Sequence, residues 1–250
     1  MRTTAISNMK GGVGKTTTAI HLALLLHKFH RAKVLLVDCD PQCNLTQFFE
    51  ADPSKGNTAG ALLAGGEMYA IACIQHTAFD GVDIIAADDR LMELDLSALS
   101  TDRVKIYTFR QMILELGRRG AYDYVLFDCP PAFNSACAAA LIACDDVVIP
   151  IKLDAFSVAG MTNVLRQVQN MRKINSNLRV AGILPTMWYK SETIANAEQI
   201  IRDSRLHVYP HIRRSNKADE VTFEHSLAPA MSGHMKDYKT FAAEYIGGRK

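Results

Sequence analysis

The residues with the clearest capacity for chemistry form one short segment near the start of the chain: Lys10-Gly11-Gly12-Val13-Gly14-Lys15-Thr16-Thr17. Its glycines let the backbone curl so that successive amide N–H groups point into one concavity, which suits a phosphate. We expect Lys15 to reach the β- and γ-phosphates of a nucleotide, and the Thr16 hydroxyl to bind Mg²⁺. Thr17 is placed to donate to the α-phosphate. The segment therefore predicts a nucleotide-binding loop with a magnesium ion.

A phosphate-binding loop needs a strand before it and a helix after it, because the helix N-terminus adds partial positive charge to the same spot. Residues 3–7 alternate in polarity as a short strand does, and the Ala/Leu-rich residues 18–29 predict a helix. The standard pattern G-x-x-x-x-G-K-[ST] fails here, since its first glycine falls on Met9. A second lysine, Lys10, stands beside the glycine pair. The alternative is a glycine-rich turn with two solvated lysines, which the strand and helix context disfavours.

Carboxylates follow two later apolar runs. Asp38 and Asp40 lie in the sequence D-x-D-P-Q after residues 33–37, and Asp128 ends the run 122–127. Such positions lie on the ligand-binding edge of a parallel sheet. We expect Asp38 and Asp128 to belong to the magnesium site, with Asp128 holding a metal-bound water. Asp40 is the candidate to position or deprotonate the attacking water. The alternative is that Asp38 and Asp40 only cap the following turn.

Composition limits the function less than these motifs do. The chain has 250 residues, of which 48% are hydrophobic and 22% charged, as in ordinary soluble proteins. The formal net charge of +2 means that any surface for nucleic acid must be a local patch. No apolar run is long enough to span a bilayer, so we expect a cytoplasmic protein. The six cysteines form no C-x-x-C pair and are expected to be free thiols.

Strand and helix patterns alternate along the chain and predict an α/β fold. We expect a doubly wound, mostly parallel sheet with helices on both faces, the three-layer arrangement of P-loop NTPases, as one domain over residues 1–250. Among the individual elements, Thr58 is predicted to cap a short helix at 59–63, and a second helical piece is predicted at 68–75. A helix at 105–118 is expected to turn Leu114 inward, and residues 234–246 predict an amphipathic helix.

The motif K-G-G-x-G-K-T-T, with D-x-D-P-Q and the later F-D-C-P-P, resembles the deviant Walker A motif and switch regions of the ParA/MinD family of ATPases. The resemblance implies Mg-dependent hydrolysis of ATP and an ATP-dependent homodimer in which Lys10 reaches the partner's nucleotide. It also implies a partitioning function, with nonspecific binding to DNA, association with the nucleoid and a ParB-like centromere-binding partner. Cys43 stands where the family usually has glycine, a departure that could alter the flexibility of switch I.

The same resemblance suggests contacts in the second half of the chain. Thr186 and Met187, which follow the predicted strand 179–184, are candidate contacts to the adenine, and Pro210 is a candidate second wall. The basic residues Arg213, Arg214 and Lys217 are candidate DNA contacts. Their alternative is an ordinary solvated charged loop.

The sequence leaves two other functions open. A MinD-like positioning ATPase on a membrane would end in a basic amphipathic helix, but the C-terminal helix here carries Asp237, Glu244 and Tyr245, which suits packing better. A nonenzymatic module that binds ATP and only positions a partner is the other alternative. The presence of all three motif carboxylates argues against it.

Overall fold

A seven-stranded sheet lies at the centre of the computed structural model, which describes residues 1–55, 57–65, 70–97, 105–154, 157–216 and 232–248. The strand order is β3-β4-β2-β5-β1-β6-β7. Six strands run parallel: β1 (Arg2–Ile6), β2 (Val34–Asp38), β4 (Val82–Ile85), β5 (Tyr124–Asp128), β6 (Asp146–Lys152) and β7 (Arg179–Thr186). The edge strand β3 (Ile74–His76) is antiparallel to β4. The mostly parallel sheet is therefore confirmed.

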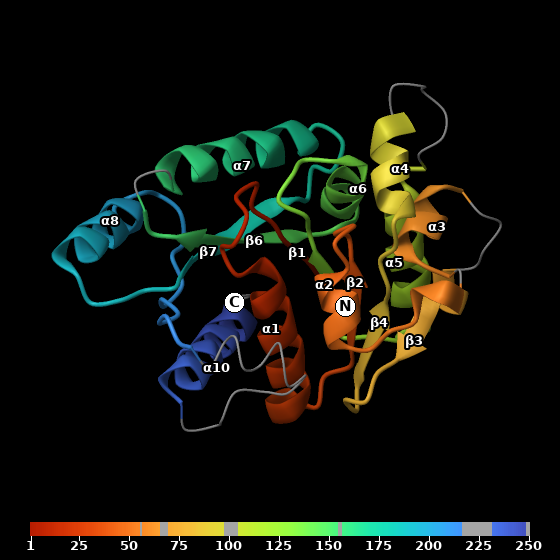
Figure 1. Cartoon of the computed structure of the whole chain (residues 1–250), viewed down its shortest axis with the longest axis horizontal. Helices are drawn as coiled ribbons and strands as arrows, with labels where there is room; N and C mark the ends of the chain where they lie inside the picture. Colours follow the sequence, from red (N-terminus) through yellow and green to blue (C-terminus); the bar gives the residue numbers. More distant parts are fainter. Residues whose placement is uncertain (56, 66–69, 98–104, 155–156, 217–231, 249–250) are drawn as a thin grey trace.

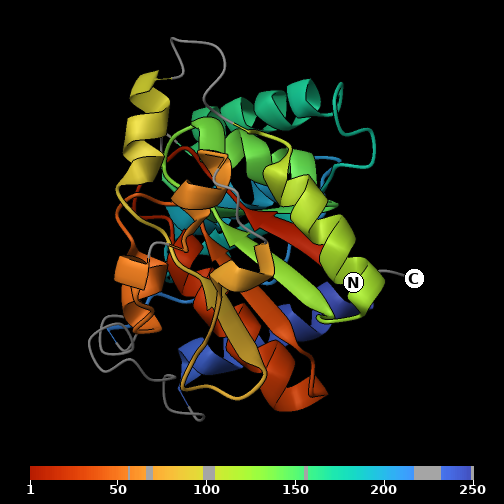
Figure 2. The same cartoon turned by 90° about the vertical axis from the view of Figure 1, so that its right-hand side faces the viewer.

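Helices cover both faces of this sheet, as Figure 1 shows. Apolar residues of α3 (Ala59–Leu63), α4 (Arg90–Ser97), α5 (Thr108–Arg119), α6 (Ser135–Ala143) and α7 (Ser157–Met171) form one core. On the other face, α1 (Lys15–His30), α2 (Asn44–Phe48) and α10 (Gly233–Gly247) form the second core. The helix α8 (Glu192–Arg202) packs near β7 at the end of the sheet. Figure 2, turned by 90°, shows the same layers from the side of β3. The three-layer prediction holds.

Two local predictions were wrong in part. The helical piece expected at 68–75 is a 3-10 turn, Ala70–Cys73, followed at once by the edge strand β3. In α5, Phe109, Met112 and Leu116 are buried, whereas Leu114 is 57% exposed. These buried positions follow a spacing of three and four residues, and Leu114 lies off that stripe. No helix among the described residues is both long and apolar enough to cross a bilayer.

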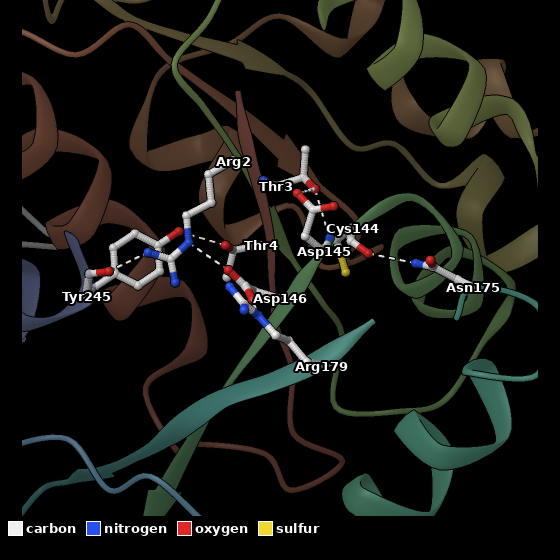
Figure 3. A network of polar contacts seen from close by, with 9 residues as sticks. All are labelled: Arg2, Thr3, Thr4, Cys144, Asp145, Asp146, Asn175, Arg179 and Tyr245. Atoms are coloured by element: carbon white, nitrogen blue, oxygen red, sulfur yellow. Dashed lines mark hydrogen bonds and ion pairs between the residues drawn. The ribbon is translucent and has the colours of Figure 1, made fainter. Parts of the chain in front are cut away.

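A buried polar network holds the C-terminal helix against the amino-terminal edge of the sheet (Figure 3). Asp146 accepts hydrogen bonds from Arg2 Nε and Arg179 Nε, each at 2.6 Å. The Arg2 guanidinium lies 3.7 Å from the centre of the Tyr245 ring, and Arg2 Nη1 donates to the Tyr245 carbonyl oxygen. The Tyr245 hydroxyl is 2.6 Å from Thr4 Oγ1. Because the buried charges are paired, the network fixes α10 without leaving Asp146 uncompensated.

The amino-terminal half of α10 packs on α1 through three rings. His21 stacks on Tyr238 with centroids 4.2 Å apart, and the His234 ring meets both edge-on. His21 Nδ1 donates to the Thr17 carbonyl oxygen at 2.8 Å, but its buried Nε2 has no hydrogen-bond partner within the described parts of the chain. Burial is the main reason why the pKa of His21 falls from 6.5 to about 4.

The lowered pKa of His21 predicts that the protein loses stability in acid. As the pH falls below 6.5 the unfolded chain takes up the His21 proton first, so the free energy of unfolding should decrease until about pH 4. The loss from His21 should be about 2 kcal/mol at pH 5, at 1.36 kcal/mol per pH unit. The pKa of Asp38 is raised to about 6, mainly by burial, and its protonation acts in the opposite direction over the same range. The His21→Leu variant, compared with the parent by urea unfolding at pH 7 and pH 5, isolates the histidine.

The exposed His30 provides the matched control, because His30→Gln changes a histidine in the same helix. The His30→Gln variant should keep the parent's change in stability between the two pH values. If His21→Leu lost as much stability in acid as the parent, the assignment to His21 would be wrong.

Candidate nucleotide site

The loop between β1 and α1 has the geometry of an anion cradle. Gly12 and Gly14 have φ angles of 65° and 81°, in the left-handed region that side chains disfavour, and α1 begins directly afterwards at Lys15. Lys15 Nζ curls back and donates to the Lys10 carbonyl oxygen at 3.1 Å. Burial lowers the pKa of Lys15, while the nearby Asp128 raises it. A negatively charged ligand would offset the free-energy cost of burying the positive charge of Lys15.

Two side chains that the sequence analysis did not identify, Asn8 and Asp154, make contacts with Lys10 of this loop. Asn8 Nδ2 donates to the Pro150 carbonyl oxygen at 2.7 Å, and Asn8 Oδ1 accepts from the Lys10 amide at 3.0 Å. The Lys10 ammonium in turn pairs with Asp154, which follows β6. The position of Asp154 just beyond a parallel strand was the available signal, since such positions gather ligand-binding groups. Lys10 is thus held by its own chain.

The three predicted carboxylates, Asp38, Asp40 and Asp128, meet at the carboxyl ends of neighbouring strands. Asp38 and Asp128 are paired in register at the ends of β2 and β5, and both are fully buried. Burial, followed by the charge of Asp38, raises the pKa of Asp128 well above its ordinary value, and Thr16 and Lys15 act in the opposite direction. The sequence therefore predicted correctly which carboxylates share one edge of the sheet.

Asp128 is the carboxylate that best fits a magnesium site. Its two oxygens are buried and make no hydrogen bond of normal geometry with the described residues. Thr16 at the start of α1 supplies the adjacent hydroxyl. No three histidine, cysteine or acidic residues within the described ranges converge as a cage of protein ligands. That arrangement suits Mg²⁺, which retains water molecules and takes few protein ligands. Thr16 and Asp128 would hold the ion beside the phosphates.

Asp38 and Asp40 belong to a tightly hydrogen-bonded loop. Asp38 Oδ1 accepts from the Asp40 amide at 3.0 Å, and Asp38 Oδ2 accepts from both the amide and the hydroxyl of Thr46. Asp40 Oδ1 accepts from the Gln42 amide at 2.9 Å. Cys43 has a φ of 55°, so the residue that replaces the family's usual glycine holds a left-handed backbone.

A cleft of about 270 Å³ opens beside the phosphate-binding loop. Gly14 and Thr17 line its phosphate end, and Thr186 and Met187 line the neighbouring wall. Thr186 Oγ1 also donates to the Val13 carbonyl oxygen at 2.9 Å, so it supports the loop itself. Further lining residues are Lys152, Tyr189, Ile212, Arg213, Arg214, Ser215, Asn216, His234 and Tyr238. A nucleotide held by the loop would extend into this cleft.

Pro210, the predicted second wall for the adenine, is not among the residues that line this cleft. It lies in a separate depression with Glu198 and Arg202. The Tyr209 amide donates to Ile183 and the Ile212 amide to Pro185, so the segment runs along β7. This path brings Ile212, two residues further on, to the cleft.

The predicted DNA residues differ in what they contact. Arg213 forms a two-pronged ion pair with Asp237 of α10, with N–O distances of 2.8 and 2.7 Å. Arg214 is exposed, and its amide donates to the Trp188 carbonyl oxygen. Lys217 lies outside the described residues. Arg213 therefore has a structural partner already, which composition could not reveal.

Comparison with known proteins agrees with this geometry. A family model described as an AAA domain matches residues 1–180. The chromosome partitioning protein ParA of Caulobacter vibrioides is 33% identical over 208 residues, which cover 83% of this chain and 76% of that protein. The solved structure of apo McdA from Cyanothece has a TM-score of 0.86 and 26% identity, over 99% of this chain and 100% of that one.

A third similar protein was solved with ligands. Cobyrinic acid a,c-diamide synthase from Mycobacterium smegmatis, with a bound ATP analogue and magnesium, has a TM-score of 0.83 and 27% identity. The match covers 100% of this chain and 98% of that one.

Proposed function

Because this chain belongs to the ParA family of P-loop ATPases, with an AAA domain over residues 1–180, we propose that it is an Mg-dependent ATPase that partitions DNA. In this proposal residues 1–250 form one ATPase domain that dimerises when it binds ATP. The dimer binds DNA without sequence preference, and hydrolysis returns it to a monomer. A ParB-like centromere-binding protein is the proposed stimulating partner, with action at the nucleoid in the cytoplasm.

The chemistry follows from the charges around the phosphate-binding loop. Cleavage of the β–γ bond spreads negative charge over the phosphoryl oxygens, which the loop N–H groups and Lys15 would stabilise. Magnesium supplies further positive charge when bound at Thr16 and Asp128. Asp40, only 7% exposed and held by the Gln42 amide, is the proposed group that orients the attacking water or removes its proton.

The observation that supports a dimer is the position of Lys10. Its ammonium lies at the edge of the loop with 31% of the side chain exposed, and it pairs with Asp154 of the same chain, itself 29% exposed. An ion pair that is partly exposed to solvent is weakened by water, so Lys10 can exchange Asp154 for a better partner. The phosphates of a nucleotide in a second subunit would be such a partner. The pair therefore suits a lysine that changes partners on dimerisation.

The dimer can be tested with two matched variants of this pair. Lys10→Ala should weaken ATP-dependent dimerisation by about 10-fold or more, because a charge-assisted contact to phosphate is lost. Asp154→Asn releases Lys10 from its internal partner and should leave dimerisation equal to or stronger than in the parent. Light scattering with and without ATP measures both. A Lys10→Ala protein that dimerises as the parent does would contradict the proposal.

DNA binding is proposed to depend chiefly on Arg214, since the guanidinium of Arg213 is held by Asp237. Arg214→Ala should weaken binding uniformly across DNA sequences. It should flatten the slope of log K against log salt by about one unit per lost phosphate contact. Salt titrations with random duplexes and a nonhydrolysable ATP analogue measure this slope.

The exposed Arg118 on α5 is the control, because Arg118→Ala removes the same charge from a different layer. If Arg118→Ala and Arg214→Ala changed the slope equally, the contact surface would lie elsewhere. If the parent bound no DNA with ATP, partitioning would lose its support, and the alternative of a positioning ATPase would take its place.

A further inference from the structure

The loop that carries Asp40 is tied to the sheet through one buried threonine. Thr46 Oγ1 donates to Asp38 Oδ2 at 2.7 Å and accepts a hydrogen bond from the Ala87 amide at 2.8 Å. The Thr46 amide donates to the same carboxylate oxygen at 2.9 Å. Both Thr46 and Asp38 are essentially inaccessible to water, with exposures of 2% and 0%. A single hydroxyl therefore joins the ends of β2 and β4.

The other oxygen of Asp38 extends this connection to the proposed catalytic residue. Asp38 Oδ1 accepts from the Asp40 amide at 3.0 Å, so the backbone of Asp40 is fixed by the carboxylate that Thr46 holds. Asp38 accepts three hydrogen bonds in all from this loop, whereas Asp128 makes none of normal geometry with the described residues. Buried carboxylates with such different surroundings are suited to different functions.

We propose that Asp38 and Thr46 form a clamp that positions Asp40 for hydrolysis, so that Thr46 is a positioning residue and Asp38 is an anchor of the loop instead of a magnesium ligand. The hydroxyl of Thr46 is the critical atom, because it connects the Asp38 carboxylate to the Ala87 amide, two residues beyond the end of β4. Loss of this atom would let the Asp40 loop shift, and a shift of about 1 Å in a reacting group can cost on the order of 100-fold in rate. The clamp revises the sequence assignment of Asp38 and leaves that of Asp128 in place.

The first test compares two threonine hydroxyls that are equally buried. Thr46→Val keeps the shape of the side chain and removes the hydroxyl, whereas Thr58→Val removes a hydroxyl that donates to Asp88 at 2.8 Å and caps α3. Both variants should lower the melting temperature, because each leaves a buried partner unsatisfied. Only Thr46→Val should lower kcat, by about 10- to 100-fold, with ATP affinity within threefold of the parent.

The conservative variant separates the hydroxyl from the rest of the side chain. Thr46→Ser should restore kcat to within about threefold of the parent, because it retains both hydrogen bonds. The clamp is wrong if Thr46→Val keeps the parent's kcat, if Thr46→Ser is as slow as Thr46→Val, or if Thr58→Val is slowed equally.

A second test does not depend on turnover or on the folding of Thr46→Val. The Mg²⁺ concentration that gives half of the maximal ATP affinity is measured by calorimetry for Asp38→Asn and Asp128→Asn. Asp128→Asn should raise this concentration about 10-fold or more, and Asp38→Asn should leave it within twofold. An equal rise in both variants would make Asp38 a magnesium ligand and overturn the clamp.

The inference rests on the proposed hydrolysis of ATP, and the two can fail separately. A parent protein without turnover would count against the proposed function, while the magnesium titration would still decide the role of Asp38.

Discussion

Lys15→Ala should reduce the affinity for ATP by on the order of 100-fold or more, as measured by isothermal titration calorimetry with magnesium present. Lys15 is 7% exposed, at the first position of α1, and within the described ranges its ammonium donates to the Lys10 carbonyl oxygen alone. Burial of the Lys15 charge is unfavourable in the parent protein, as the lowered pKa of Lys15 indicates. The alanine variant loses the attraction to the phosphates that would offset this cost.

Lys55 gives a control of the same residue type, because it is exposed on a turn outside the site. Lys55→Ala should bind ATP as the parent does. Equal affinities for the parent and Lys15→Ala would show that the nucleotide does not use this loop.

Asp40→Ala should keep ATP and magnesium but hydrolyse about 10²- to 10⁴-fold more slowly, because a group that orients or deprotonates water is lost. The Asp40 carboxylate accepts one hydrogen bond within the described residues, from the Gln42 amide, so loss of this side chain disturbs few contacts. If the dimer opens only after hydrolysis, the variant should remain dimeric with ATP. Single-turnover release of phosphate measures the rate, and light scattering measures the dimer.

Asp203, an exposed carboxylate at the end of α8, is the control for this change. Asp203→Ala should turn over as the parent does. Hydrolysis by Asp40→Ala at the parent's rate, or an Asp40→Ala protein that stays monomeric with ATP, would remove Asp40 from the proposed role.

Local sequence patterns were sufficient to predict features that depend on contacts within one short segment of the chain. The helix at Ala59–Leu63 has the predicted bounds, and the Thr58 hydroxyl accepts from the Ala61 amide as an N-cap does. The alternation of strands with helices predicted the parallel sheet, and parallel strands bring Asp38 and Asp128 to one edge. These inferences require only periodicity and the rule that parallel strands share an orientation.

Sequence patterns did not predict contacts between residues that lie far apart in the chain. Arg213 reads as a basic surface residue until Asp237, 24 residues later, is seen to hold it. The sequence assigned no contact to Thr46, and its hydrogen bond with Ala87 spans 41 positions. The short edge strand β3 depends on pairing with β4, so its own composition predicted a helix instead. In each case the missing information was a contact between distant segments.

The central position of β1 has a consequence for the biosynthesis of the protein. Arg2 pairs in register with Tyr124, and Thr4 with Asp146, so β1 is made more than a hundred residues before the two strands that flank it in the sheet. At about 5–20 residues per second, the wait for β5 lasts roughly 6 to 24 seconds. The interval is longer still between the synthesis of the apolar helix α1 and that of α10, which packs in the same core. The nucleotide-binding segment after β1 therefore lacks its neighbouring strands until β5 and β6 have been made.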